Sequence, residues 1–557
     1  MDIVANAGER VVDADSHVLE PPDLWQRYLE PKYRDRAIRI ERGENGERLV
    51  IGESTVLEGM LAGLGGAHLP RASLFGPGMT YLDGCPPGSF DVDGRIALYD
   101  AWGVDTGIVF PTICILPFPT TDRGLANAYC RAYNTWQMEY SQALRGRIAP
   151  IAVVNWHDVD EAARELDRCF AAGFRGLFVP PETVGGRAPG DPHFDPLWAR
   201  CNEAGLPGCL HVIVRFSGAA VAFRPWHDTK PGSTFTFAMG GTGQLMPAVA
   251  SIVLSGLFDR MPTLKVVSEE VSRQDPFRKL LLETHDGHLI ETVRIPLEKA
   301  GRFSVCVSSQ AGCALACAFC ATGRLGLRRN LESWEIIEQV RLVRATLDAK
   351  AGQRVHGVVF QGMGEPMANI DRVIEAVVAL SEPSGLAIDA RGVTVCTAGL
   401  PSGIRRLLKE CPRVRLALSI SSARPPVRRG LMPIDRAHPL EEVLEAAAEH
   451  ATTTGMAPLW AVTLLDGVNN SREDAEALAA LARSFAEKTG VRPRVSIVPY
   501  NRIDEEADPF RRVSDAGLTA FRDAMAACGI VPHVRYSGGH DVGAACGQLA
   551  GRVHAAP

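Results

Sequence analysis

Short apolar runs alternate with amphipathic segments along the first half of the chain, and this pattern predicts strands followed by helices. The segment 158–173, for example, begins at Asp158, which suits a helix N-cap, and ends at Gly173. Nearly continuous apolar strands that alternate with helices are typical of a parallel sheet, either open or closed into a barrel. We predict six such strands, at 10–18, 105–112, 147–156, 174–180, 206–214 and 263–270.

The second half repeats this α/β pattern. Helical segments such as 330–349 separate six further apolar runs, at 303–309, 355–364, 392–399, 414–421, 456–465 and 493–501. This predicts a second parallel β/α barrel, which is partial. We expect the two halves of the 557-residue chain to join near 271–279, giving domains 1–272 and 273–557.

Composition narrows the class of protein. The apolar content of 46% excludes a disordered or fibrous chain, and the formal net charge of −6 excludes a histone-like excess of positive charge. The longest apolar run, 246–258, is shorter than the roughly 20 residues that span a bilayer, and no apolar leader is visible at the N-terminus. We therefore expect a cytoplasmic protein with no membrane partner, whose 14 cysteines are free, metal-bound or catalytic.

Four of these cysteines lie within fifteen residues, and three of them form the motif Cys313-x3-Cys317-x2-Cys320. Three thiolates leave the fourth iron of a [4Fe–4S] cluster open, so that it can bind the amino and carboxylate groups of S-adenosylmethionine (SAM). The alternative is a zinc knuckle, which needs a fourth ligand nearby. His356 is the nearest downstream candidate and lies well outside a compact knuckle.

A glycine-containing turn, Gly362-Met-Gly364-Glu365-Pro, follows the apolar run VHGVVF. Glycines at a strand end let the backbone approach a ligand closely. Glu365 is therefore a candidate acceptor for the SAM amino group, although the turn alone also fits an ordinary strand-to-helix connection.

From about 275 to 553 the chain resembles the radical-SAM rRNA adenine methyltransferases of the RlmN/Cfr family. The shared blocks, in the family's order, are DGHLIETVRIP, CVSSQAGCALACAFCATGRLGLRRNL, VVFQGMGEPMAN, LMPID, SIVPYN and AACGQLAG. The resemblance implies a partial (β/α)6 radical-SAM barrel that methylates carbon 2 or 8 of an adenine in rRNA, or in tRNA. It also implies an electron donor such as flavodoxin or ferredoxin.

The resemblance further implies roles for individual residues. The three motif cysteines would hold the cluster, and SAM would be bound at Gly364, Glu365, Ser419 and Asn501. Cys546 would be methylated by one SAM, and a second SAM would give the radical that activates this methyl group. Cys306 would resolve the protein–RNA adduct by forming a disulfide with Cys546, and Glu291 would accept the proton. Such a scheme suits an electrophilic ring carbon, which ordinary nucleophilic methylation by SAM cannot modify.

The chain also differs from the family. Cys396, Ser421 and Gly543 replace residues that are usual there, so we expect an altered SAM pocket. The first half of the chain replaces the family's small helical RNA-binding domain. Arginines after the cysteine motif (Arg324, Arg328, Arg329) and a basic stretch at 405–429 are predicted to contact RNA phosphates.

The first predicted strand ends in Asp13-Ala-Asp15-Ser-His17, in which Asp15 and His17 point to the same side. With His211 they form a candidate site for a divalent metal such as zinc. Together with VVDADSHVLEPPDLW, GFRGLFVPPE and DPHFDPLWARCNEAGLP, this motif resembles the amidohydrolase-related, decarboxylase-like TIM-barrel family. Strands seven and eight are missing, and with them the family's metal-binding Asp, so we expect a truncated barrel that acts as a scaffold or is a remnant.

Three functional hypotheses follow. The first is a [4Fe–4S] radical-SAM RNA adenine methyltransferase fused to an incomplete TIM-type barrel. The second is a radical-SAM methylase of a small molecule or another substrate, which the first half recruits. The third is a metal-dependent amidohydrolase or decarboxylase in the first half.

Overall fold

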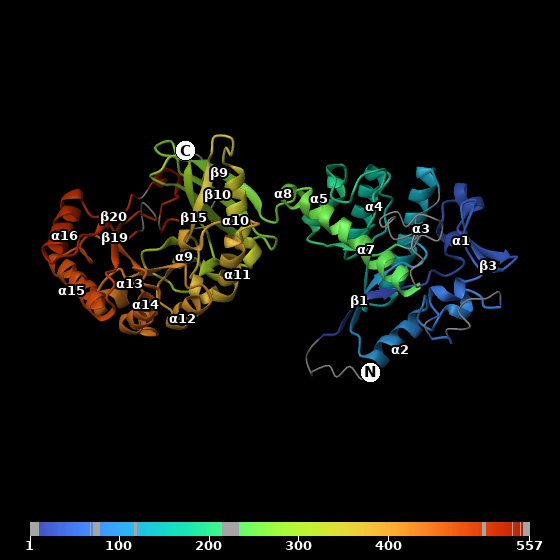
Figure 1. Ribbon diagram of the computed structural model, residues 1–557, viewed down its shortest axis with the longest axis horizontal. Helices are drawn as coiled ribbons and strands as arrows, with labels where there is room; N and C mark the ends of the chain where they lie inside the picture. Colours follow the sequence, from blue (N-terminus) through green and yellow to red (C-terminus); the bar gives the residue numbers. More distant parts are fainter. Residues whose placement is uncertain are drawn as a thin grey trace. The chain divides into compact units, whose positions relative to one another are not determined.

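The computed structural model describes residues 10–66, 68–70, 78–115, 118, 120–213, 233–503, 508–536, 538–545 and 547–549. The chain forms two compact units, Met1–Met261 and Pro262–Pro557, which are described separately (Figure 1). Among the described residues, no helix is long and apolar enough to cross a membrane.

The first unit is an incomplete TIM-type barrel with parallel strands. Strands β1, β5 and β6 form one parallel sheet, β7 and β8 form another, and a parallel bridge between Ala152 and Leu177 connects the two sheets. The first five predicted strands are therefore confirmed. The strands are β1 (Val12–His17), β5 (Thr106–Phe110), β6 (Ile148–Pro150), β7 (Leu177–Val179) and β8 (Gly208–Leu210), with an unpredicted antiparallel sheet of β2 (Arg39–Gly43), β3 (Gly46–Ile51) and β4 (Ser54–Glu58).

Helices pack against these strands through apolar side chains. Buried aromatic residues of α3, such as Tyr129, Tyr133 and Trp136, contribute to the larger of two apolar clusters in this unit. The helices are α1 (Leu24–Tyr28), α2 (Val92–Trp102), α3 (Arg123–Ala143), α4 (Val159–Ala171), α5 (Asp195–Ala204), α7 (Ser233–Leu254) and α8 (Leu257–Arg260).

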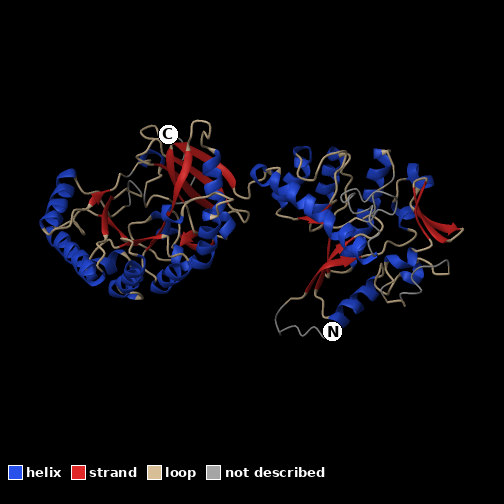
Figure 2. Cartoon of the chain, in the orientation of Figure 1, coloured by secondary structure: helices blue, strands red, loops and turns tan. Residues whose placement is uncertain are grey.

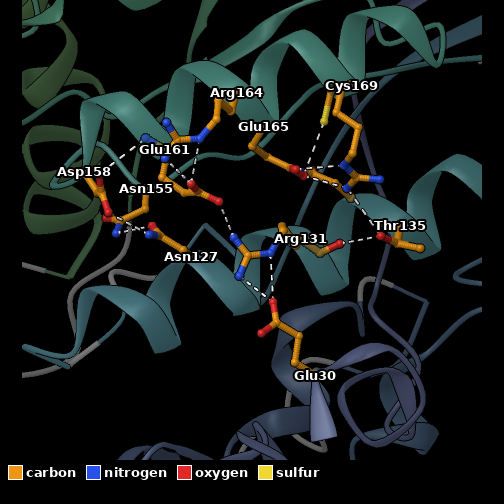
Figure 3. A network of polar contacts seen from close by, with 12 residues as sticks. Glu30, Asn127, Arg131, Thr135, Asn155, Asp158, Glu161, Arg164, Glu165 and Cys169 are labelled. Carbon is orange, nitrogen blue, oxygen red and sulfur yellow. Dashed lines mark hydrogen bonds and ion pairs between the residues drawn. The ribbon is translucent and has the colours of Figure 1, made fainter. Parts of the chain in front are cut away.

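A polar network fixes α3 against α4 (Figure 3). Arg131 of α3 donates to Glu161 of α4 at 2.6 Å and also pairs with Glu30. The Asn127 amide donates to Asp158 at 2.8 Å, and Asp158 caps α4 as the sequence predicts. These bonds hold both helices beside the end of β6.

The sixth predicted strand, at 263–270, was assigned to the wrong unit. It forms β9 (Lys265–Val271), which pairs antiparallel with β10 (Arg278–Glu283) in the second unit. The connection from β9 to β10 is short, and a short connection permits antiparallel pairing, whereas parallel pairing needs a long crossover. The first unit thus ends before β9, and its described part has five barrel strands.

The second unit is built on a ten-stranded sheet in the order β20-β19-β18-β17-β16-β15-β12-β11-β10-β9. The strands from β12 to β20 run parallel, and β11, β10 and β9 extend the sheet in antiparallel fashion. All six predicted strands of this half are confirmed. The strands not yet given are β11 (Leu289–Pro296), β12 (Arg302–Cys306), β15 (Arg354–Phe360), β16 (Val393–Thr397), β17 (Arg415–Ser419), β18 (Leu459–Leu464), β19 (Arg494–Pro499) and β20 (His533–Val534).

Helices follow the outer side of this sheet (Figure 2). Their apolar faces join the strands in one large core, which includes Val340, Leu407 and Trp460. The main helices are α10 (Ser333–Ala345), α11 (Ile370–Ser381), α12 (Pro401–Glu410), α13 (Pro425–Leu431), α14 (Leu440–Thr454), α15 (Arg472–Thr489) and α16 (Asp515–Ala527). With helices outside, the loops at the carboxyl ends of the parallel strands are left to form a site.

Candidate active site at the carboxyl ends of the second sheet

The three motif cysteines lie on a loop that is fixed at both ends by a β-hairpin. β13 (Gln310–Cys313) pairs antiparallel with β14 (Gly326–Asn330). The Cys320 amide donates to the Cys317 carbonyl at 3.2 Å, and α9 (Ala321–Leu325) begins directly after Cys320. Gly312 is required in this hairpin, because its φ is 79° and a Cβ there would lie 1.9 Å from the Gly326 carbonyl oxygen.

These thiols influence one another's protonation. Burial raises the pKa of Cys317 to about 12, and the neighbouring Cys320 and Cys313 thiols add to the rise. Burial likewise raises the pKa of Cys313 to about 11. A metal centre displaces such protons, because the thiolate is the ligand.

The spacing of the sulfurs helps to choose the metal centre. A single zinc ion with Zn–S bonds of about 2.3 Å would hold its sulfurs roughly 3.8 Å apart. Among the described residues, the only trio of candidate ligand atoms within 4.8 Å of one another is Asp15, His17 and His211 in the first unit. The three cysteine sulfurs are therefore not all within 4.8 Å of one another.

The glycine-containing turn after β15 is bonded to the strand that leads into the cysteine loop. The Glu365 amide donates to the Gln310 side chain at 2.8 Å, and Gly364 lies so close that a Cβ there would be 2.6 Å from Cβ of Gln310. The buried Glu365 carboxylate accepts from the amides of Met367 at 3.0 Å and Ala398 at 2.8 Å. Burial raises the pKa of Glu365, and these backbone donors oppose the rise. Each carboxylate oxygen can accept a further hydrogen bond, so the group remains able to bind an amine.

The other two predicted SAM positions lie at strand ends of the same sheet. Ser419 is the last residue of β17, and Asn501 is buried two residues after β19 ends. Because β15, β17 and β19 run parallel, their carboxyl ends meet at one edge of the sheet. The structure thus brings Gly364, Glu365, Ser419 and Asn501 to the same edge.

A fully buried arginine joins these strand ends, and its burial was not predicted. Arg428 is 0% exposed and donates to the carbonyls of Ser419 at 2.8 Å and Ala398 at 2.9 Å. It forms a buried ion pair with Asp435 at 3.0 Å, and its charge opposes the rise in the pKa of Cys317. Arg428 therefore donates a hydrogen bond at the predicted SAM position Ser419 and acts through its charge on Cys317 of the cysteine loop.

Cys546 lies outside the described residues, but its neighbours are bonded to the cysteine loop. The Ala321 amide donates to the Gly547 carbonyl at 2.9 Å, and the buried Thr322 hydroxyl donates to the Leu549 carbonyl at 2.6 Å. These bonds hold the C-terminal segment against the residues that directly follow Cys320.

Glu291 and Cys306 lie on adjacent antiparallel strands. Cys306 is directly opposite Val293, and Glu291 lies two residues from Val293, so the two side chains are diagonal neighbours on one face. Both are buried, with exposures of 1% and 8%. A fully buried lysine, Lys279, lies 3.2 Å from the Glu291 carboxylate.

The predicted metal residues of the first unit do meet. Nε2 of His17 and His211 are 3.1 Å apart, and an Asp15 carboxylate oxygen lies 3.3 Å from Nε2 of His211. Nδ1 of His17 is 2.8 Å from the Pro111 carbonyl, an orientation that directs Nε2 toward the trio. Burial and the neighbouring His211 lower the pKa of His17. A cavity of about 460 Å³ lies next to this trio, since Phe178 lines the cavity and its ring centroid is 6.5 Å from that of His211.

Comparison with known proteins gives a family to each half. Residues 13–289 match the amidohydrolase family, and residues 307–482 match the radical SAM superfamily. A "Probable RNA methyltransferase" of Sorangium cellulosum is 61% identical over 52% of this chain and 77% of its own length. The "Dual-specificity RNA methyltransferase RlmN" of Syntrophobacter fumaroxidans is 40% identical over 52% of this chain and 80% of its own. The chain belongs to the RlmN-type radical SAM RNA methyltransferases.

A solved structure is similar as well. The radical SAM methyltransferase from Sphaerobacter thermophilus is 37% identical, covers 54% of this chain and 86% of its own, and has a TM-score of 0.49. The resemblances inferred from the sequence, to RlmN-type enzymes and to amidohydrolases, are both confirmed.

In this radical SAM RNA methyltransferase, the predicted phosphate-binding stretch at 405–429 is largely a set of ion pairs. Arg405 pairs with Glu449 at 2.8 Å, Arg424 pairs with Asp474 at 3.2 Å, and Arg428 is buried. Arg329, after the cysteine motif, likewise binds two carboxylates. Arg428 is buried and therefore cannot contact phosphates, whereas Arg405, Arg424 and Arg329 keep exposed area beside their acidic partners. The phosphate-binding surface stays a prediction for these three arginines.

The three departures from the family occupy constrained positions. Ser421 is buried with a φ of 56°, and its carbonyl accepts from Asn469 at 2.7 Å. Gly543 has a φ of 61°, a backbone conformation that glycine adopts without strain. Cys396 is buried in β16, the strand that leads to Ala398. The altered pocket stays a prediction.

Proposed function

We propose that the chain transfers a methyl group from SAM to an adenine ring carbon in RNA by way of a methylated Cys546. The observation that carries this proposal is the set of bonds that joins three segments: the cysteine loop, the turn of Gly364 and Glu365, and the residues flanking Cys546. The names of the relatives supply RNA as the substrate class.

Each chemical group of the site receives one task in this proposal. Cys313, Cys317 and Cys320 hold a [4Fe–4S] cluster, while Gly364, Glu365, Ser419 and Asn501 bind SAM. When bound, the cluster and SAM would supply the one-electron chemistry that activates the S-methyl group and that accepts the electron released when the adduct becomes aromatic again. A flavodoxin or ferredoxin supplies single electrons to the cluster.

The remaining steps use side chains of this chain. Glu291 removes the proton from the substituted ring carbon, and the electron pair of that C–H bond returns to the ring. The Cys306 thiolate then attacks the sulfur of Cys546. The electron pair of the carbon–sulfur bond moves to the methylene carbon, which takes up a proton and becomes the methyl group. A Cys306–Cys546 disulfide is left, and an external thiol reductant returns it to two thiols.

The test is anaerobic reconstitution of the full chain with iron, sulfide and SAM, followed by mass spectrometry of nucleosides from rRNA and tRNA. We expect a methyladenosine in treated RNA, and none with Cys317→Ala, which should lose both cluster absorbance and SAM cleavage. Methylated Cys546 with no modified nucleoside in either RNA would instead favour a small-molecule methylase.

We propose a more limited role for the first unit. Asp15, His17 and His211 offer three ligand atoms to a divalent metal such as zinc, and the geometry of the trio supports this. Because the described part of this barrel has five strands and the sequence shows no counterpart of the family's strand-eight Asp, we infer weak metal binding and a scaffold role without hydrolase or decarboxylase activity. Zinc titration monitored by calorimetry tests this inference.

A further inference from the structure

A buried lysine that belongs to no sequence motif lies between two carboxylates. Lys279 of β10 is 0% exposed, and its Nζ is 3.2 Å from a carboxylate oxygen of Glu291 on β11 and 3.4 Å from one of Glu270 on β9. Burial of an ammonium group is costly and is found almost only where the charge is paired. This position therefore calls for an explanation beyond packing.

The lysine shares one face of the sheet with the groups of the proposed proton transfer. Lys279 is directly opposite Val293, and Val293 is directly opposite Cys306, so a row of side chains crosses β10, β11 and β12. Glu291 lies two residues from Val293 on the same face. The cation, the proposed base and the proposed resolving thiol are thus neighbours.

Lys279 interacts with the two carboxylates through its charge. Within the described part of the chain its Nζ has no hydrogen-bond partner, although both carboxylate oxygens are within 3.4 Å. An ion pair of this kind acts through charge, and in a buried site the attraction is screened less than at the surface. Removing the cation would take this charge away from the buried Glu291 carboxylate and from the partly exposed Glu270 carboxylate.

We propose that Lys279 is a positioning residue that holds the Glu291 carboxylate on the face of Cys306 until the RNA adduct forms. This inference rests on the proposed role of Glu291 as the base. In the step concerned, the C–H bond of the substituted ring carbon breaks, the proton passes to Glu291, and the electron pair returns to the ring. Glu270 still pairs with Lys279 once Glu291 has taken up this proton. A single lysine between two carboxylates suits this change of charge.

The test separates the steps of the reaction in the reconstituted full-length enzyme with an unmodified 23S rRNA transcript. Lys279→Met should retain the cluster, methylate Cys546 from labelled SAM and cleave SAM, yet accumulate a covalent RNA–protein adduct on denaturing gels. Turnover should fall about 10- to 100-fold, part of the factor that a general base contributes. Lys279→Arg should restore turnover to within a few-fold, because it keeps the charge. Lys265→Met, which removes an exposed lysine paired with Glu283 on the same two strands, is the matched control and should behave as wild type.

Two further variants make the outcome unambiguous. Lys279→Gln keeps a hydrogen-bond donor for both carboxylates, and it replaces Lys279→Met if that protein does not fold. Glu291→Gln tests the base itself and should accumulate the same adduct. If Glu291→Gln stalls but both neutral Lys279 variants turn over normally, the role of Lys279 is refuted while the proposed function stands. If Glu291→Gln turns over normally, the base assignment fails and the role of Lys279 fails with it. Equal loss of cluster, Cys546 methylation and turnover in both neutral variants would show a purely structural lysine.

Discussion

Replacing Gly364 by alanine is expected to displace the turn that carries Glu365. Gly364 has a φ of 102°, and an added Cβ would lie 2.6 Å from Cβ and 2.8 Å from the backbone nitrogen of Gln310. Real Cβ atoms do not approach other atoms so closely, so the turn and the strand that leads to the cysteine loop must move apart.

The cost has two parts. A non-glycine residue in such a backbone conformation costs about 1–3 kcal/mol, and overpacking against a fixed neighbour costs about 1–3 kcal/mol more. If the turn moves to relieve about 2–6 kcal/mol, SAM binding should weaken by roughly 30-fold or more, since each 1.4 kcal/mol is tenfold. Cluster assembly should persist, because the cysteine ligands are unchanged.

Calorimetric titration of SAM into the anaerobically reconstituted variant measures the affinity, and thermal unfolding measures the stability. Gly490→Ala is the matched control, since Gly490 also has a positive φ, 72°, but an added Cβ would have no neighbour within 4 Å. Its cost should be about 1–2 kcal/mol, with unchanged SAM affinity. Our explanation would be refuted if Gly364→Ala bound SAM as wild type does and lost no more stability than Gly490→Ala.

Three further predictions concern other groups. Thr322→Val removes the hydrogen bond to the Leu549 carbonyl, which is worth about 1 kcal/mol. It should slow the methylation of Cys546 by labelled SAM while SAM cleavage continues, and Thr322→Ser should restore the rate. Unchanged methylation in Thr322→Val would contradict this. Cys306→Ala should methylate Cys546 and then accumulate the RNA adduct on gels, whereas Cys546→Ala should form none; the opposite pattern would reverse the two roles. His211→Ala should weaken zinc binding in a calorimetric titration and leave RNA methylation unchanged, and a loss of methylation in a folded protein would show that the units share chemistry.

Strands were predictable here because a buried parallel strand is apolar along its whole length. This property identified five strands in the first unit and six in the second. It also caused the error at β9, because an apolar run does not reveal whether its partner is parallel or antiparallel, and only the pairing with β10 decides that. Motif spacing likewise located the cysteine loop, whose geometry depends on neighbours in the sequence.

The burial and the ionic partners of charged side chains were not predictable in the same way. Arg405 forms an ion pair with Glu449, which lies forty-four residues further along the chain. Arg428 is buried by its contacts with the ends of two strands and with Asp435. A run of arginines in the sequence therefore does not show which of them are buried and which have acidic partners in the fold. Lys279 shows the same limit, since Glu270 and Glu291 reach it only through pairing of three strands.

The bonds that assemble the proposed methyltransferase site all lie within the second unit. Each of these contacts joins two segments between Pro262 and Pro557. They are the hydrogen bonds between Gln310 and Glu365, between Arg428 and Ser419 and between Thr322 and Leu549, and the ion pair between Lys279 and Glu291. The metal trio, in contrast, lies wholly in the first unit. Substitutions that share no partner and lie in separate compact units are expected to add independently. The double variant His211→Ala, Lys279→Met should therefore lose metal binding as His211→Ala does and accumulate the RNA adduct as Lys279→Met does. Each effect should be as large as in the single variant.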